Sequence, residues 1–354
     1  MKQESVVSPS DSIHLSWENI SARISPKASS RRSGFSEILK RKFRSNYTEP
    51  TEKQLLHSIS GYAIPGKILA ILGPSGAGEQ KALPGLHGRQ EDGMNVEGNL
   101  FMNGVNLLKM NKLLMTKCGY VEQHELFIGT MTIKEHLIFQ AMLRMKSSIS
   151  DSDRRARVQE VLSIMDLETC QNTIIGVPDK LKGINNVEMK RLTFASVILN
   201  DPKLLIVDEP TSGLDFHLAK SVVNIMKKLT DAGKTMITVI NEPTSEIYSL
   251  LDMVCLLVNG KQVYFGDRTG AMEFFASCLQ CPCPFNYNPA EYYLTQLSTS
   301  TNNNEFIEKC IEAFQHSPYN QTMIEMIHAV GGAPQDGVLA DRFVAVVERS
   351  CDEL

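Results

Sequence analysis

A short apolar run that ends in a glycine-rich stretch constrains the fold of this chain more than any other feature. The run covers residues 67–72 and is followed by Gly73-Pro74-Ser75-Gly76-Ala77-Gly78. It predicts a buried strand, and the glycines predict a tight turn out of that strand. Two glycines separated by four residues form the frame of a phosphate-binding loop, in which backbone N–H groups and a helix N-terminus hold phosphate oxygens. The full pattern continues with Lys and then Ser or Thr, whereas this chain continues with Glu79 and Gln80.

Further apolar runs alternate with segments of helical periodicity. Between residues 132 and 167 the apolar positions recur at helical spacing, and 148–153 separates two predicted helices. Strands are predicted at 204–207 and 236–240, as a hairpin arm at 96–105, and as a pair at 250–258 and 261–264. Strands that alternate with helices favour an α/β fold with a mostly parallel sheet covered by helices.

An acidic pair ends one of these predicted strands. Asp208 and Glu209 follow the run 204–207 directly. A carboxylate at the end of a buried strand is suited to bind Mg²⁺, and the next carboxylate is suited to polarise an attacking water. Strands often end in Asp or Glu, so the pair alone is weak evidence. Its place about 130 residues after the glycine-rich stretch makes the combination much more specific.

Composition excludes several classes of protein. Lys and Arg number 36 against 40 Asp and Glu, which gives a net charge of −4 and argues against a dedicated nucleic-acid binder. A hydrophobic fraction of 42% argues against a mostly disordered chain. No run of about 18 apolar residues predicts a transmembrane helix, and the polar N-terminus does not indicate a secretory signal. The eight scattered cysteines are typical of reduced, cytosolic thiols.

Both ends of the chain differ in composition from the middle. Residues 1–50 hold nine Lys or Arg and five Asp or Glu, a net +4 that leaves −8 for the remainder. They are interpreted as a basic, Ser-rich segment with a first strand near 14–20, and either as simply solvated or as a patch for an anionic membrane surface. Residues 51–328 are expected to form one domain, with a helical part at about 124–200, and 329–354 a linker or tail.

With these motifs in order, the chain resembles the nucleotide-binding domain of an ATP-binding-cassette transporter of the White/ABCG subfamily. The resemblance covers about residues 14–328. Residues 71–78 match the family's phosphate loop, 119–123 its Q-loop, with 131–135 beyond it, 204–210 its Walker B strand and 212–215 its D-loop. Residues 287–292, Tyr-Asn-Pro-Ala-Glu-Tyr, are similar to the stretch that follows the family's last strands.

The resemblance implies a P-loop NTPase fold of the ABC type, with an antiparallel β-layer and a helical subdomain. It implies ATP and Mg²⁺ as cofactors. Glu209, Gln123 and the switch position Asn241 would then be the catalytic residues, and Asp208 and Gln123 the Mg²⁺ ligands. The cofactor-binding positions that it implies are Gly73, Pro74, Ser75, Gly76, Ala77, Gly78, Glu79, Gln80, Asn185, Asn186, Val187, Glu188 and Asp215.

The phosphate loop departs from the family's pattern at the two positions whose side chains contact the phosphates and Mg²⁺. Glu79 stands where the family has the lysine that neutralises the β- and γ-phosphates, and Gln80 where it has the Mg²⁺-binding serine. At an effective dielectric constant of ~20, two unit charges about 4 Å apart interact by roughly 4 kcal/mol, so the reversed sign is a large loss. Lys81 is a poor substitute, because on a helix it is turned about 200° away from position 79.

Two further elements depart from the family. The signature Ser-Gly-Gly-Glu aligns with Asn185-Asn186-Val187-Glu188, and Val187 stands where close backbone approach needs glycine. The switch histidine aligns with Asn241, which can donate a hydrogen bond but cannot carry a proton or a positive charge. Because each ATP site of the family combines the phosphate loop of one chain with the signature of the other, these changes predict weak ATP binding and weak or absent hydrolysis.

Three functions remain open from the sequence. The first is the energy-coupling domain of a half-transporter with impaired hydrolysis, acting with a dimer partner and a transmembrane domain. The second is a non-catalytic module that dimerises with an intact family member and regulates it. The third is a truncated product without function. We expect the domain at the cytoplasmic face of a membrane if it is joined to a membrane domain, and in the cytoplasm if it acts alone.

Overall fold

The computed structural model describes residues 12–24, 53–74, 94–106, 118–123, 127–177, 180–299 and 304–331. Its central layer is a six-stranded sheet in the order β10-β9-β3-β8-β7-β6. Neighbouring strands from β9 to β6 run parallel, and β10 pairs antiparallel with β9 at the edge. The strands are β3 (Ile68–Leu72), β6 (Cys118–Val121), β7 (Leu204–Asp208), β8 (Thr235–Val239), β9 (Met253–Val258) and β10 (Lys261–Asp267).

Continuous burial explains why these strands read as unbroken apolar runs. All residues of β3, β8 and β9 are buried, and so are the first four residues of β7. A parallel sheet is covered on both faces, so its strands do not alternate between apolar and polar residues. The mostly parallel α/β sheet predicted from the sequence is therefore confirmed, together with the strand pair that turns at Asn259 and Gly260, both of which have positive φ.

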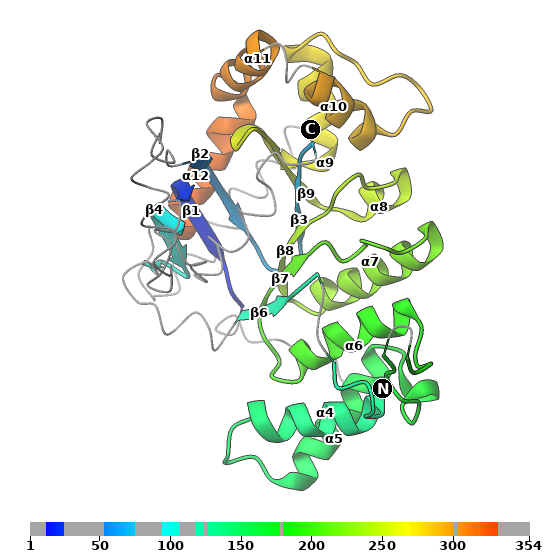
Figure 1. Ribbon diagram of the computed structural model, residues 1–354. Helices are drawn as coiled ribbons and strands as arrows, with labels where there is room; N and C mark the ends of the chain where they lie inside the picture. Colours follow the sequence, from blue (N-terminus) through cyan, green and yellow to red (C-terminus); the bar gives the residue numbers. More distant parts are fainter. Residues whose placement is uncertain are drawn as a thin grey trace, which may run out of the picture.

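A second, antiparallel layer lies beside the parallel sheet, at the left of Figure 1. Its strand order is β2-β1-β4-β5, with β1 at Leu15–Ile24, β2 at Lys53–Ala63, β4 at Met94–Met102 and β5 at Val105–Asn106. Irregularities interrupt the pairing of β1 with both neighbours, and Asn19 in β1 and Ser58 in β2 have positive φ. The turn at Asn103-Gly104 joins β4 to β5 and lies within the hairpin arm predicted at 96–105. This is the antiparallel β-layer that the family resemblance implies.

Three longer helices pack together at one end of the sheet, at the bottom of Figure 1. They are α4 (Ile133–Arg144), α5 (Asp151–Ile164) and α6 (Asn186–Ile198), with a 3₁₀ turn at Glu168–Cys170 between α5 and α6. Thr132 starts α4 as a capping box, since its side chain accepts from the Glu135 amide and the Glu135 carboxylate accepts from the Thr132 amide. Ser150 caps α5 in the segment that the sequence assigned to a break between helices.

Helix α7 (Phe216–Asp231) packs against β3 and β8 of the parallel sheet, and the short helix α8 (Ser245–Leu250) connects β8 to β9. The helices that follow β10 are α9 (Arg268–Glu273), a π-helical turn at Phe274–Cys278, α10 (Pro289–Thr299), α11 (Asn304–Gln315) and α12 (Pro318–Gly331). Helix α12 packs on β1, β2 and β10. It continues to Gly331, so residues 329–331 are helical, although composition had placed them in a linker. Among the described residues, no helix is both long enough and apolar enough to span a bilayer.

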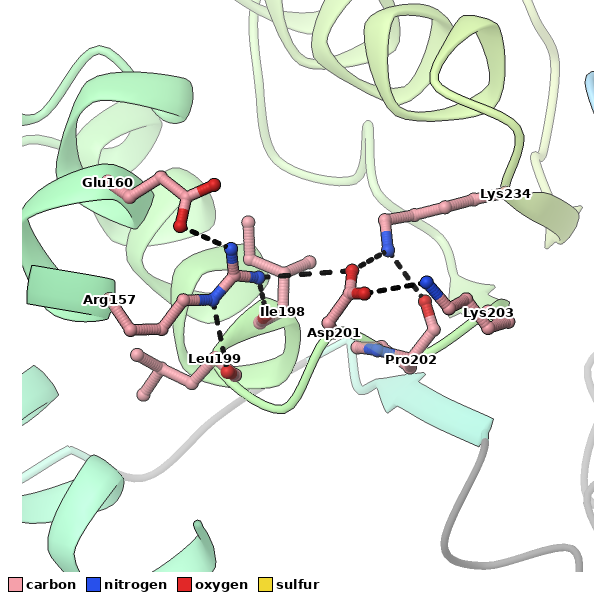
Figure 2. A network of polar contacts seen from close by, with 8 residues as sticks. All are labelled: Arg157, Glu160, Ile198, Leu199, Asp201, Pro202, Lys203 and Lys234. Atoms are coloured by element: carbon pink, nitrogen blue, oxygen red, sulfur yellow. Dashed lines mark hydrogen bonds and ion pairs between the residues drawn. The ribbon is translucent and has the colours of Figure 1, made fainter. Parts of the chain in front are cut away.

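A polar network joins α5 to the loops that lead into β7 and β8 (Figure 2). The Arg157 guanidinium donates to the carbonyls of Ile198 (2.7 Å) and Leu199 (3.3 Å) at the end of α6 and lies 3.9 Å from a carboxylate oxygen of Asp201. Asp201 accepts from the ammonium groups of Lys234 (2.6 Å) and Lys203 (2.7 Å). Lys234, which is 8% exposed, also donates to the carbonyl of Pro202. Capped carbonyls and a paired buried ammonium keep this corner of the fold satisfied.

Candidate functional site

Three predicted catalytic residues follow three neighbouring strands. Glu209 comes directly after β7, Gln123 two residues after β6, and Asn241 two residues after β8. The order β8-β7-β6 places β7 between the other two, and all three run parallel. Their carboxyl ends therefore meet at one edge of the sheet, which is where open α/β sheets bind ligands.

Glu209 is held between the two amide side chains. Gln123 donates from Nε2 to Oε2 of Glu209 at 2.6 Å, and Asn241 donates from Nδ2 to Oε1 at 2.5 Å. Gln123 Nε2 also lies 3.2 Å from Oγ of Ser212 in the predicted D-loop. Glu209 is 6% exposed, and a buried carboxylate needs such donors because it has lost most of its water. The structure thus brings Gln123, Glu209 and Asn241 into direct contact.

The backbone at Glu209 adopts an uncommon conformation. Its φ is +41°, a region in which L-residues are crowded between Cβ and the backbone. Its N–H donates to the carbonyl of Val239 on β8 at 3.1 Å, and its carbonyl accepts from the N–H of Ser212. Local strain of this kind is kept where the surroundings over-determine the conformation, and it clusters at functional sites. Here the strain turns the side chain of Glu209 toward the residues that follow β6 and β8.

Asp208, the predicted Mg²⁺ ligand, retains an oxygen that is free to coordinate a cation. Its Oδ2 accepts a 3.4 Å contact from the hydroxyl of Tyr120, while its buried Oδ1 has no hydrogen-bond partner among the residues that the structure describes. Burial, followed by the charge of Glu209, raises the pKa of the Asp208 carboxyl. A divalent cation would satisfy the orphaned oxygen and favour the ionised form, and carboxylate and amide oxygens are ligands that Mg²⁺ accepts. The orphaned oxygen of Asp208 therefore fits the cation that the resemblance implies, while Gln123, the other predicted ligand, uses its Nε2 on Glu209 and Ser212.

The predicted Q-loop is also tied to helix α6, a contact that the sequence did not suggest. Lys190 on α6 donates from Nζ to the backbone carbonyl of Gln123 at 2.6 Å. The two residues are 67 positions apart, so no local pattern announces the bond. Its effect is to fix the backbone from which the Gln123 side chain reaches Glu209.

The signature positions form the start of helix α6. Asn185 is the N-cap: its Oδ1 accepts from the Glu188 amide, and the Glu188 carboxylate accepts from the Asn185 amide, both at 2.9 Å. Asn186 is the first residue of α6, and Val187 is 8% exposed, with its branched side chain buried at the first turn. Asn185 and Glu188 thus satisfy amides of their own helix, as the first turn of any helix requires.

The D-loop residue Asp215 has a similar local role. It caps helix α7 by accepting from the Leu218 amide at 3.1 Å. Gly213, two residues earlier, has a φ of +72°, which glycine adopts without steric cost. The glycine therefore sets the turn that carries the chain from Glu209 to α7.

Of the phosphate loop, the structure describes the first two residues. Gly73 and Pro74 follow β3 directly, and the carbonyl of Ile71 in that strand accepts from the Ile240 amide at 3.3 Å. The loop thus starts next to the segment that carries Asn241. The remaining predicted positions, Ser75, Gly76, Ala77, Gly78, Glu79 and Gln80, lie outside the described residues.

Comparison with known proteins decides the family. The family model for the ABC transporter domain matches residues 56–212. Protein white of Drosophila melanogaster is 45% identical over 248 residues, which cover 70% of this chain and 36% of that protein. The chain carries an ABC nucleotide-binding domain of the White/ABCG type. The transporter wht-1 of Caenorhabditis elegans is 40% identical over 293 residues, 82% of this chain and 43% of that protein, and ABC transporter G family member 13 of Arabidopsis thaliana is 36% identical over 258 residues, 73% and 37%.

The solved structures agree with the fold of this ABC domain. The ATP-binding subunit of an ABC transporter superposes with a TM-score of 0.56 at 18% identity and covers 80% of this chain and 99% of its own. At that identity the match supports the fold. The chain spans between 36% and 43% of the length of the three White/ABCG relatives named above.

Proposed function

We propose that this chain acts as the nucleotide-binding domain of a White/ABCG-type transporter in which ATP binding is weak and hydrolysis is weak or absent. The observation that carries the proposal is the contact of Asn241 with Glu209. In the family, the switch position is a histidine that can gain a proton beside the γ-phosphate. An asparagine amide holds Glu209 in place but has no proton to exchange near neutral pH. The site therefore keeps the carboxylate that would polarise water and lacks the histidine that would exchange a proton beside the γ-phosphate.

The electrostatics of the site support weak binding of ATP. Asp208 and Glu209 stand side by side at the end of β7, and burial and the charge of Glu209 raise the pKa of Asp208. In the sequence, Glu79 replaces the lysine that would balance the phosphates, which adds a third carboxylate. Without that lysine, a bound Mg²⁺ ion is left to compensate both the carboxylates and the phosphates. Each of these negative charges repels the phosphates of ATP and so weakens its binding at a site with a low dielectric constant.

The signature end of α6 supports weak hydrolysis from the other side of a dimer. A phosphate that approaches a helix N-terminus needs free backbone amides and little side-chain bulk. Here Val187 fills the first turn, and the Asn185 side chain accepts from the Glu188 amide. This chain would therefore present a crowded signature to the phosphate loop of its dimer partner.

Exposed apolar side chains on the helical region support contact with a transmembrane domain. Phe139 and Leu143 lie four residues apart on α4 and therefore share one face of that helix. Ile128 lies beside Val177 in space, because the Gly176 amide donates to the carbonyl of Gly129. All four side chains, and Leu181, are exposed in the isolated domain. Burial of such a surface against another domain is the ordinary reason to keep it apolar.

A second candidate is a module that dimerises with an intact family member without hydrolysing ATP. The ordered D-loop favours it, because Ser212 contacts Gln123 and Asp215 caps α7 although the phosphate-binding residues have changed. In this case the D-loop contacts would serve the interface with the partner chain.

Calorimetry with Mg-ATP tests the first proposal. The native chain is compared with a double revertant, Glu79→Lys with Gln80→Ser, and with the same revertant that also carries Asp208→Asn. We expect the revertant to bind at least a hundredfold more tightly than the native chain, which corresponds to about 2.8 kcal/mol. The Asp208→Asn variant should lose most of the Mg²⁺ dependence of that binding. Micromolar binding with steady ATP turnover by the native chain would overturn the proposal.

A further inference from the structure

Asn288 joins the C-terminal helices to the segment that carries the switch position. Its side-chain Nδ2 donates to the backbone carbonyl of Pro243 at 2.8 Å, two residues after Asn241. Its Oδ1 accepts from the Ala290 amide at 3.2 Å and so caps the start of α10. The two ends of one amide group are thus used at once, one on α10 and the other on the switch segment. The residues are 45 positions apart in the sequence.

Helix α10 is firmly packed and can therefore serve as the fixed end of this link. The ring of Tyr293 is 1% exposed and stacks on Phe275, with ring centroids 4.1 Å apart and planes 19° from parallel. The Tyr292 amide donates to the backbone carbonyl of Asn288 at 2.9 Å, which closes the first turn of the helix. An aromatic pair of this geometry adds to the stabilisation that burial already provides. Asn288 is consequently held by its backbone as well as by its cap.

The switch segment has a second, independent attachment on its other side. The Ile240 amide donates to the carbonyl of Ile71 in β3. Between that bond and the bond to Pro243 lie two residues, Asn241 and Glu242, and Glu242 has a φ of +47°. A short segment with an uncommon backbone conformation keeps that conformation when both of its ends are fixed.

We propose that Asn288 is a positioning residue, which acts through Pro243 to hold the Asn241 side chain on Glu209. The C-terminal helices thereby set the geometry of the switch position from outside the parallel sheet. This inference rests on the proposed function only in that position 241 is called the switch position. Its geometry exists in the ligand-free chain, so it can be tested without nucleotide.

Two substitutions separate the two bonds of Asn288. Asn288→Asp keeps an oxygen that can cap α10 but loses the donor to Pro243. Asn288→Ser also keeps a capping oxygen, carries no charge and is too short to reach Pro243. The matched control is Asn320→Asp, because Asn320 likewise donates from Nδ2 to a backbone carbonyl, that of Gln315, within the C-terminal helices. All variants are compared with the native full chain.

Hydrogen exchange measured by mass spectrometry reports the outcome. Both Asn288 variants should speed exchange in peptides that cover residues 240–246 by about three- to tenfold, the change expected for one lost net hydrogen bond. Hydrogen exchange in α10 should stay as in the native chain in both Asn288 variants. In the Asn320→Asp control, the side-chain amide resonance of Asn241 should also keep its native position. In the Asn288 variants the Asn241 resonance should shift.

Unchanged exchange at 240–246 in both Asn288 variants would overturn the proposal. So would an equal increase throughout α10, because that result would assign Asn288 to the helix cap alone. Neither outcome depends on whether the chain binds ATP. Failure of the calorimetric experiment described above therefore leaves this inference standing, and the reverse also holds.

Discussion

Asn241 and Glu209 meet through a 2.5 Å hydrogen bond between residues that follow adjacent parallel strands, β8 and β7. The bond satisfies one oxygen of a carboxylate that is 6% exposed, and Gln123 satisfies the other. A polar group of this kind, surrounded by donors, stabilises the loops that supply them. The hydrogen bonds of the site therefore contribute to the stability of the fold. Substitution of the residues that make them should change the free energy of unfolding even without a ligand.

We expect substitution of Asn241 to destabilise the chain in a way that depends on charge. Asn241→Ala leaves one oxygen of buried Glu209 without its donor and should cost about 1–3 kcal/mol in the free energy of unfolding. Asn241→Asp places a second carboxylate against Glu209 and should cost more. Urea unfolding at pH 7 measures both, and the double variant Asn241→Asp with Glu209→Gln should recover part of the loss. Equal stability of Asn241→Ala and Asn241→Asp would contradict this account.

His136 should make the chain less stable in mild acid. Its Nε2 lies 3.1 Å from Oγ of Ser196 between α4 and α6, and Phe127 packs edge-on to its ring. Burial, with a smaller contribution from Arg144, lowers the pKa of His136 from 6.5 to about 4. The folded state thus disfavours the protonated ring, so this contribution is fully present above pH 6.5 and is lost as the pH falls toward 4.

The size of that effect follows from the pKa difference. Between pH 7 and pH 5 the native chain should lose about 2 kcal/mol through His136 alone. Urea unfolding of the native chain and of His136→Gln at both pH values gives the difference, in which the other titrating groups cancel. An identical pH dependence of the two proteins would show that His136 is not the group responsible.

The network of Figure 2 predicts an asymmetry between two substitutions. Asp201→Asn leaves the buried ammonium of Lys234 without its carboxylate and should cost about 2 kcal/mol. Asparagine tolerates the positive φ of position 201, +49°, so the backbone is not the cause. Lys234→Met removes the buried charge itself and should cost less, since Lys203 still pairs with Asp201. Thermal unfolding that ranks the two variants in the opposite order would contradict the prediction.

Gly119 should not tolerate a side chain. A Cβ atom at this position of β6 would lie 2.4 Å from Cγ1 of Val197 and 2.9 Å from side-chain atoms of Leu205 and Pro202. Gly119→Ala should therefore cost about 1–3 kcal/mol through overpacking. The double variant with Val197→Ala opens the closest contact and should be less destabilised than the two single variants added together. Additive losses in chemical unfolding would show that the strain lies elsewhere.

Much of the fold follows from local pattern. The runs at 67–72, 204–207 and 236–240 are continuous because β3, β7 and β8 are buried on both faces, and this signal is strong. The break at 148–153 became the connection between α4 and α5 because Ser150 caps a helix. The first strand is less visible, since the bulges of β1 at Asn19 and of β2 at Ser58 disturb the alternation that an antiparallel sheet would otherwise show.

The contacts within the site are less accessible from sequence. Asp208 and Glu209 are adjacent in the chain, and their place at a strand end is a local property. The bonds from Gln123 and Asn241 to Glu209, from Lys190 to Gln123 and from Asn288 to Pro243 span 32 to 86 positions. They depend on how strands and helices are ordered in space, which periodicity does not specify. Family motifs locate Gln123 and Asn241, whereas nothing local distinguishes Lys190 from any other lysine on a helix.

The bonds of Arg157 connect the helical region to the parallel sheet. Arg157 lies on α5. Its guanidinium donates to the last carbonyls of α6 and forms an ion pair with Asp201, which precedes β7. These contacts connect the helical region to the start of β7, the strand that Glu209 follows directly. We therefore expect the helical region to move together with the parallel sheet at this corner, because Arg157 bonds α5 both to the end of α6 and to Asp201 ahead of β7.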